Sequence, residues 1–181
     1  MLSKKHLPHQ EADEHLVIFL RRHWFIALKI VLFFALLAIL PFALYFILQT
    51  NTDLSSDNNV KSVFLTIGAS VYYLFIWLFF FYALLDFYLD IWIVTNKRII
   101  SIEQHGLFAR TIAEQRLSRV QDATSEVKGL FPTFLNYGDV HIQTAGEVSR
   151  FVFKQVPNAR EVAKHIIVLA DKRKLKEGNG L

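Results

Sequence analysis

The sequence VFLTIGASVYYLFIWLFFFYALL, residues 63–85, contains no charged side chain over its whole length. A transmembrane helix needs about 20 consecutive apolar residues, because each adds about 1.5 Å towards a hydrocarbon core about 30 Å thick. The segment meets that length, and it carries aromatic residues at Tyr72, Tyr73, Trp77 and Tyr82. We therefore predict a transmembrane helix over residues 63–85.

Another apolar run lies closer to the N-terminus. Residues 30–48 carry no charge, and the run extends back to Trp24 with Lys29 as its one charged residue. Lys29 lies near the end of the run, where its amine can reach the headgroups while its stem stays in lipid. A cleaved signal peptide is the alternative, but its apolar region is only about 7–15 residues long. We predict a transmembrane helix over residues 24–48, with Pro41 tolerated inside it.

The charges that flank the two runs predict the orientation of this hairpin. An Arg-Arg pair at residues 21–22 precedes the first run and a Lys-Arg pair at residues 97–98 follows the second. The linker, residues 49–62, has one basic residue. Basic residues collect on the cytoplasmic side of spanning helices. We therefore expect a cell-membrane protein with residues 1–23 and the C-terminal half in the cytoplasm and the linker outside.

Two acidic residues, Asp86 and Asp90, directly follow the second run. Carboxylates inside a membrane mark ion sites, whereas those at its surface are in contact with water. Because both residues lie beyond the apolar run, we expect solvated carboxylates at the interface and no ion site.

After the second run, the sequence changes to short segments in which apolar and polar residues alternate, which is the period of β-strands. Ile100 and Ile102 alternate with polar neighbours, and Phe151 and Phe153 flank Val152. Each segment predicts one buried face, with Phe151 and Phe153 inward and Val152 outward. The turn residues between the segments predict about five to seven strands.

A helix is predicted after the last strand. Asn158 is a potential N-cap, and Glu161 three residues later completes a capping-box pattern. Apolar residues then recur at helical spacing, at Val162, Ile166 and Leu169. A basic tail, residues 172–181, ends the chain. The expected fold class is α+β: a two-helix transmembrane hairpin, then an antiparallel β-barrel or sandwich capped by an amphipathic C-terminal helix.

Four short motifs occur in a fixed order in this half of the chain. They are WIVTNKRII at residues 92–100, GLF at 106–108, the segment 117–122, and the alternating segment 138–146 between two glycines. Together they resemble the bacterial PH domain family of membrane-flanked proteins. The resemblance covers residues 89–171 and implies a PH-like binding domain, with two preceding spans as its usual companion.

The sequence offers no constellation for catalysis. Cysteine is absent, which excludes disulfides, thiolate zinc sites and cysteine nucleophiles. No HExxH, GxSxG or glycine-rich phosphate motif occurs either. We predict that the protein is not an enzyme and has no catalytic, cofactor-binding or metal-binding residues. The net charge of +4 is modest, and without a basic recognition helix we expect no nucleic-acid partner.

A scattered set of basic residues is the first candidate binding site. Its members are Lys97, Arg98, Arg116 and Arg119. They can contact anionic lipid or a protein partner, and the lipid interpretation requires the hairpin at residues 97–98 to point back at the bilayer. The alternative is that these are solvated surface charges, which we favour because they are not clustered in the sequence.

An apolar segment without strand alternation is the second candidate. Its large side chains are Leu130, Phe131, Phe134 and Leu135. Such a segment can dip into the lipid interface or bind a neighbouring subunit. The alternative, which we favour, is that it folds over an open end of the barrel and fills the core.

The sequence therefore predicts a non-catalytic membrane protein. Its cytoplasmic PH-like domain would bind a protein partner, a second copy of the chain or the surface of the lipid bilayer. Two alternatives stay open: an accessory subunit of a transport or export system, and an enzyme acting on membrane lipids.

Overall fold

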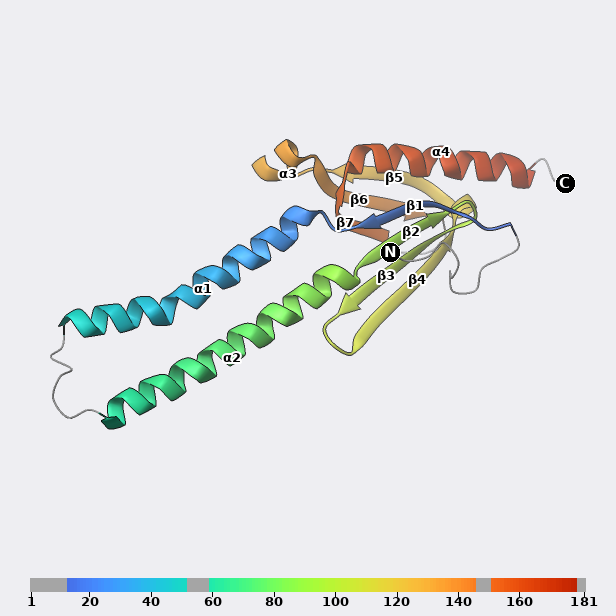
Figure 1. Cartoon of the computed structure of the whole chain (residues 1–181). Coiled ribbons are helices and arrows are strands. Elements are labelled where there is room, and N and C mark those ends of the chain that lie inside the picture. Colours follow the sequence, from blue (N-terminus) through green and yellow to red (C-terminus); the bar gives the residue numbers. More distant parts are fainter. Residues whose placement is uncertain (1–12, 52–58, 146–150, 179–181) are drawn as a thin grey trace. The chain divides into compact units, whose positions relative to one another are not determined.

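A computed structural model describes residues 13–51, 59–145 and 151–178 of the chain. The chain divides into two compact units (Figure 1). One unit consists of Trp24–Phe87 alone. The other combines the residues up to His23 with Tyr88–Leu181, so the chain leaves this unit and later returns to it.

In its described residues the first unit consists of two long helices, α1 (Trp24–Asn51) and α2 (Asn59–Leu89). Both are long and apolar enough to cross a membrane. Their large side chains are exposed, as with Leu36 at 69% and Phe64 at 71%. A helix that is apolar on all sides is typical of a membrane span or of a large protein's core. Neither apolar window is buried inside the protein, so composition and length favour the membrane.

Pro41 lies inside α1 and removes one helical hydrogen bond. The carbonyl oxygen of Leu37 lies four residues earlier and would accept that bond from any other residue type. In the structure, the hydroxyl of Tyr72 on α2 donates to this oxygen at 3.0 Å. Tyr72 therefore donates to the carbonyl oxygen that has no helical donor because of Pro41, which explains how the helix tolerates the proline.

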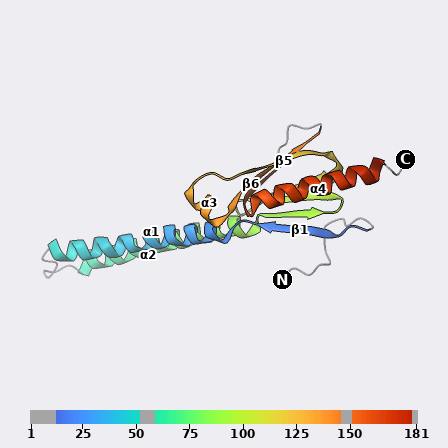
Figure 2. The ribbon, with the colours of Figure 1, turned by 90° about the horizontal axis from the view of Figure 1, so that it is seen from above.

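Within the described residues, the second unit contains two antiparallel sheets, two α-helices and a short 3₁₀ helix, Leu117–Arg119 (Figures 1 and 2). The first sheet has the order β1-β2-β3-β4 and the second the order β5-β6-β7. The strands are β1 (Leu16–Arg21), β2 (Ile91–Thr95), β3 (Arg98–His105), β4 (Ala109–Arg116), β5 (Val120–Glu126), β6 (Tyr137–Thr144) and β7 (Phe151–Pro157). The short helix α3 (Leu130–Leu135) joins β5 to β6, and α4 (Ala159–Gly178) follows β7. The predicted fold class is confirmed, as two packed sheets rather than a closed barrel.

The sequence analysis did not identify strand β1. This strand pairs antiparallel with β2, with Leu20 opposite Trp92 and Arg21 opposite Ile91. Its sequence LVIFLR lacks apolar–polar alternation, and its partner strand comes only after both long helices. The sheet therefore starts before α1, and α1 and α2 form an insertion between its first two strands.

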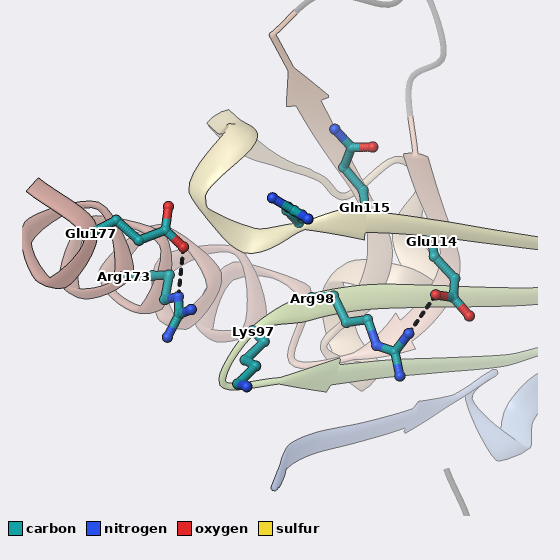
Figure 3. A pocket seen from close by; sticks show the side chains of 7 residues that line it. Lys97, Arg98, Glu114, Gln115, Arg173 and Glu177 are labelled. Carbon is teal, nitrogen blue, oxygen red and sulfur yellow. Dashed lines mark hydrogen bonds and ion pairs between the residues drawn. The ribbon is translucent and has the colours of Figure 1, made fainter. Parts of the chain in front are cut away.

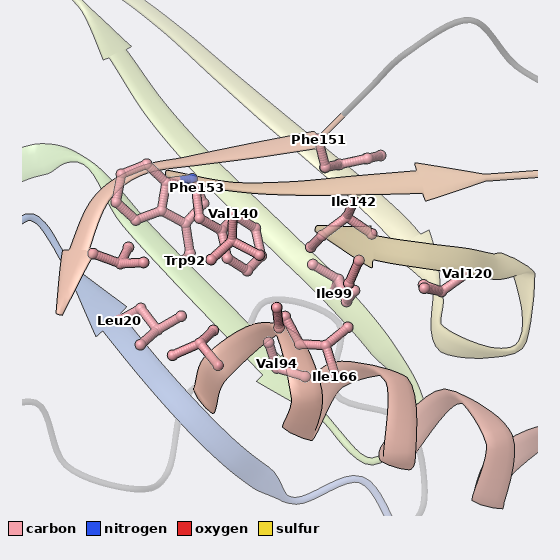
Figure 4. Packing of buried hydrophobic residues seen from close by; sticks show 14 of the residues in the cluster. Leu20, Trp92, Val94, Ile99, Val120, Val140, Ile142, Phe151, Phe153 and Ile166 are labelled. Atoms are coloured by element: carbon pink, nitrogen blue, oxygen red, sulfur yellow. The ribbon is translucent and has the colours of Figure 1, made fainter. Parts of the chain in front are cut away.

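A single large cluster of apolar side chains holds the two sheets and α4 together (Figure 4). Trp92 from β2, Phe153 from β7 and Ile166 from α4 are completely buried in it. The predicted inward positions of Phe151 and Phe153 are confirmed, and Val152 between them is only partly buried. Truncating such a buried phenylalanine to alanine typically costs about 3–5 kcal/mol.

The two isoleucines of β3 that were expected to face the core lie in a separate cluster. Ile100 and Ile102 pack with Ile93, while Ile99 belongs to the main cluster. The prediction of one buried face for this strand was therefore wrong: β2 and β3 are central strands whose two faces are both buried. Strands that are buried on both faces typically have continuous apolar sequences.

Replacing Tyr72 by Phe should reveal the contact with the Leu37 carbonyl. We expect Tyr72→Phe to lower the free energy of unfolding by about 1 kcal/mol, the typical value for a hydrogen bond between membrane helices. In a Pro41→Ala background the same substitution should have little effect, because residue 41 then supplies the missing N–H. Titration of the purified chain with a denaturing detergent measures both values, and equal losses in the two backgrounds would refute this role of Tyr72.

Candidate functional site

The strand register divides the second unit into two ends, which differ in chemistry. At the entry end, β1 stops at Arg21 opposite Ile91, the first residue of β2. The chain passes into α1 and returns from α2 at this end. At the distal end, β3 begins at Arg98 opposite Arg116, the last residue of β4. Strand β3 has eight residues, so the two ends are separated by about 23 Å.

An ion pair with a buried carboxylate joins the two points at which the chain meets the long helices. A terminal nitrogen of the Arg22 guanidinium binds Oδ2 of Asp90. The other carboxylate oxygen of Asp90 accepts a hydrogen bond from the backbone N–H of Gln104 at 2.9 Å. The side chain of Asp90 is only 2% exposed. The expectation that Asp90 is a solvated carboxylate was therefore wrong, because its charge is compensated inside the protein.

His23, the last residue before α1, ties the entry end to the second sheet. Its ring stacks on Tyr137 with the centroids 4.9 Å apart, and its backbone N–H donates to the carbonyl of Gln155 at 2.7 Å. The residue is 8% exposed. Burial disfavours the charged imidazolium and lowers the pKa of His23 below its ordinary value near 6.5.

Helix α3 also lies at the entry end, since Tyr137 directly follows its C-cap residue Asn136. Its large side chains project from the protein: Leu130 is 77%, Phe131 61% and Phe134 85% exposed. Leu135 is partly buried, and no residue of α3 belongs to the core. The favoured interpretation that this segment fills the core was therefore wrong.

The backbone explains why α3 stands away from the core. It begins after Gly129, whose φ of 104° is accessible mainly to glycine, and it ends at Asn136 in the left-handed conformation. Gly138 then brings β6 so close to β5 that an added Cβ would lie 2.5 Å from the Glu126 carbonyl oxygen. The six residues of α3 are thus confined to a short loop at the edge of the sandwich.

The turn between β3 and β4 lies at the same end. The sequence analysis used its GLF motif only for the family resemblance and did not propose the turn as a contact site. Its apolar residues are Leu107, 46% exposed, and Phe108, 98% exposed. The available signal was the dipeptide itself: two large apolar residues follow the turn glycine Gly106, where polar residues are usual.

The predicted basic residues gather at the distal end. Lys97, Arg98 and Arg116 line an open depression of about 370 Å³ (Figure 3). Glu114 and Gln115 also line it, as do Arg173 and Glu177 from α4. Arg119, the fourth predicted residue, is exposed in the neighbouring 3₁₀ turn but is not among the lining residues. Four cations and two carboxylates thus face one depression, which suits a ligand or partner with negative charge.

Arg98 is held by the protein's own carboxylates. Its guanidinium donates to both carboxylate oxygens of Glu14, at 2.9 and 3.0 Å, and to Glu114 at 2.6 Å. Glu14 is fully buried and also accepts from the Thr95 hydroxyl at 2.8 Å. The hydrogen bond that Arg98 donates to Glu14 is the main cause that raises the pKa of Arg98. Arg98 therefore anchors the chain ahead of β1 to the first sheet, and Lys97 and Arg116 are the better-placed cations for a partner.

Comparison with known families identifies the fold that these ends belong to. A profile described as "Bacterial PH domain" matches residues 18–169, well over half of the chain. The chain belongs to the bacterial PH domain family. The resemblance inferred from the sequence is thereby confirmed, and the matched region includes most of β1 as well as both long helices.

Other comparisons add little. One similar solved structure is a DUF1696 family protein with a pleckstrin-homology domain from Shewanella loihica PV-4. It shares 18% sequence identity with a TM-score of 0.36, over 45% of this chain and 70% of that chain. No curated protein matches the chain significantly. Bacterial PH domains are generally binding modules. Within the described residues, no three His, Asp or Glu side chains are grouped so that they could hold a metal ion.

Glu14 should contribute more stability than a partly exposed carboxylate of the same sheet. We expect Glu14→Gln to lower the free energy of opening of β2 and β3 by about 1–3 kcal/mol, because Arg98 and Thr95 lose a buried charged acceptor. The control is Glu103→Gln, which breaks a more exposed pair with Lys154 and should cost less than about 1 kcal/mol. Hydrogen exchange of the β2 and β3 amides in detergent measures both, and equal effects would contradict the anchoring role.

The lowered pKa of His23 predicts a pH dependence of stability. Well above pH 6.5 the ring is neutral in both the folded and the unfolded chain and does not change the free energy of unfolding. As the pH falls below 6.5, the unfolded chain binds a proton at this ring before the folded chain does, so the free energy of unfolding decreases. Thermal unfolding of wild type and His23→Phe between pH 7.5 and 5.5 tests this. The His23→Phe variant should lose part of the pH dependence of stability. An unchanged slope of stability against pH in this variant would contradict the prediction.

Proposed function

We propose that the chain is a non-catalytic binding module anchored in the cell membrane. In this proposal residues 24–48 and 63–85 span the bilayer, the linker 49–62 lies outside, and both termini are cytoplasmic. The PH-like domain, with residues 89–171 as its main part, docks on the cytoplasmic lipid surface through its entry end. The segment 172–181 follows as a basic tail.

The observation that supports this best is the exposure of the α3 side chains at the entry end. His23 is covalently joined to the first residue of α1, and Asp90 to the last residue of α2. One residue of chain spans at most about 3.6 Å, so the entry end cannot lie far from the surface at which the spans emerge. Exposed clusters of large apolar side chains in such a position are typical of interfacial contacts.

The energies are sufficient for docking. Each leucine or phenylalanine that moves from water to an apolar environment contributes about 1.5–3 kcal/mol when fully buried. Partial insertion of Leu130, Phe131 and Phe134 would therefore contribute a few kcal/mol. Because the spans hold the domain at the membrane, its effective concentration there is of millimolar order, and this weak affinity is enough to fix its position.

The basic residues at the distal end are better suited to a protein partner. They lie about 23 Å from the entry end along β3, whereas charges in physiological salt are screened within about 8 Å. Lys97 and Arg116 would therefore feel little of the lipid surface charge when the entry end is docked. An acidic segment of a protein partner, or of a second copy of the chain, fits the depression that they line.

The orientation is tested by fusing alkaline phosphatase after Ser56 and, separately, after Gly178. The basic flanks predict periplasmic activity only for the fusion in the linker. Activity of the C-terminal fusion alone would reverse the proposed topology.

Lipid contact of α3 is tested by placing a photoreactive phenylalanine analogue at position 134 of the full chain in bilayers. We expect covalent adducts with phospholipid, detected by mass spectrometry. The matched control carries the same group at Gln121, an exposed residue at the distal end, and should give none. Absence of lipid adducts at position 134, or equal yields at both positions, would reject the docking mode.

A further inference from the structure

We propose that the β3–β4 turn, with Leu107 and Phe108, is a second lipid-inserting element, so that the domain docks on the bilayer at two points. This inference rests on the proposed function and adds to it a second contact, separate from α3. The observation that supports the second contact best is the exposure of Phe108, whose side chain is 98% exposed at the tip of the hairpin.

The hairpin projects beyond the point where the chain returns from α2. Ile91, the first residue of β2, pairs with Ile102, so the rest of β3 and the turn continue past it (Figure 1). From Ile102 to Gly106 are four residues, which extend about 13 Å at the usual rise of a strand. The headgroup layer on each side of a bilayer is about 5–8 Å thick. A turn that extends this far past the start of β2 can therefore reach the boundary between headgroups and acyl chains.

The turn is braced against the same residues that receive the chain from the membrane helices. The side chain of Gln104 donates to the carbonyl of Gly106, and its backbone N–H donates to the buried carboxylate of Asp90. Gly106 itself has φ 75°, which lets the chain reverse tightly. The position of Phe108 is thus fixed relative to Asp90, the residue that follows α2.

Two apolar tips at one end of the domain can restrain its tilt on the bilayer, which a single tip cannot do. Leu107 and Phe108 extend from the first sheet, while Phe131 and Phe134 extend from the loop of the second. One contact leaves the domain free to tilt about it, whereas two separate contacts restrain the tilt. Arg110, exposed two residues after Phe108, adds a cation that anionic headgroups can bind, at about 1 kcal/mol.

Lipid is the occupant that the connectivity favours over protein. The tips occur at the end of the domain where the chain enters and leaves two helices long enough to span a membrane. The distal end, by contrast, presents the charged depression lined by Lys97 and Arg116. A protein that covered Phe108 would have to compete with the bilayer for this space.

The absence of native cysteine allows a direct test with a single environment-sensitive nitrobenzoxadiazole label. The full chain is reconstituted in vesicles of phosphatidylcholine and phosphatidylglycerol with the label at Leu107→Cys, Phe134→Cys or Gln121→Cys. We expect blue-shifted emission at positions 107 and 134 that is quenched by lipid-attached spin labels and protected from aqueous iodide. Position 121 should behave as a water-exposed site. Adding Phe108→Asp should restore iodide quenching of the label in the Leu107→Cys variant, and the same addition should leave the label in the Phe134→Cys variant unchanged.

The outcomes separate this inference from the proposed function. A water-exposed label at position 107 together with a lipid-quenched label at 134 would overturn the second contact and leave docking through α3 intact. Water exposure at both positions would overturn both. A blue-shifted label at position 107 that lipid quenchers do not reach would mean that protein covers the turn, which would also overturn the inference. Lipid quenching at position 107 that persists with Phe108→Asp would overturn it as well.

Discussion

The ion pair between the partly exposed Arg22 and the buried Asp90 is the contact on which the arrangement of the domain depends. It joins the strand that leads into α1 to the residue that follows α2, and through Gln104 it also fixes the end of β3. Such a pair adds little net stability, because desolvation offsets most of the attraction. Breaking it would leave a buried charge, however, so alternative arrangements of these segments are disfavoured. The pair thus holds together a sheet whose first two strands are separated in sequence by the whole hairpin.

The same network determines which side chains meet at the entry end. His23 stacks on Tyr137 and so connects the start of α1 to the loop that carries α3. Asp90 connects the end of α2 to the turn that carries Phe108. The apolar tips and the connections to the long helices therefore occupy one end, and the charged depression occupies the other. A PH-like fold alone does not imply this separation, because a shared fold does not transfer a binding site.

The sequence predicted the elements whose signal is local. The uncharged run at residues 63–85, the alternation around Phe153 and the helical spacing of Val162 and Ile166 all matched observed elements. It did not predict β1, because the partner of that strand is supplied after two long helices. Nor could it predict that Arg98 is held by Glu14, 84 residues earlier, or that Asp90 is buried by a contact with Arg22. The α3 side chains were misjudged for a different reason: clustered apolar residues are usually buried, and nothing within residues 130–135 reveals that they form an exposed loop between β5 and β6.

The central claim is that the entry end faces the bilayer and the distal end faces away from it. Energy transfer from a donor on the full chain to acceptor-labelled lipid headgroups tests this most directly, with the donor at Ala109→Cys or at Arg116→Cys. These exposed positions are the first and last residues of β4, about 23 Å apart along one strand. The account predicts clearly stronger transfer from position 109 than from position 116. Equal transfer from the two positions, or stronger transfer from position 116, would contradict it.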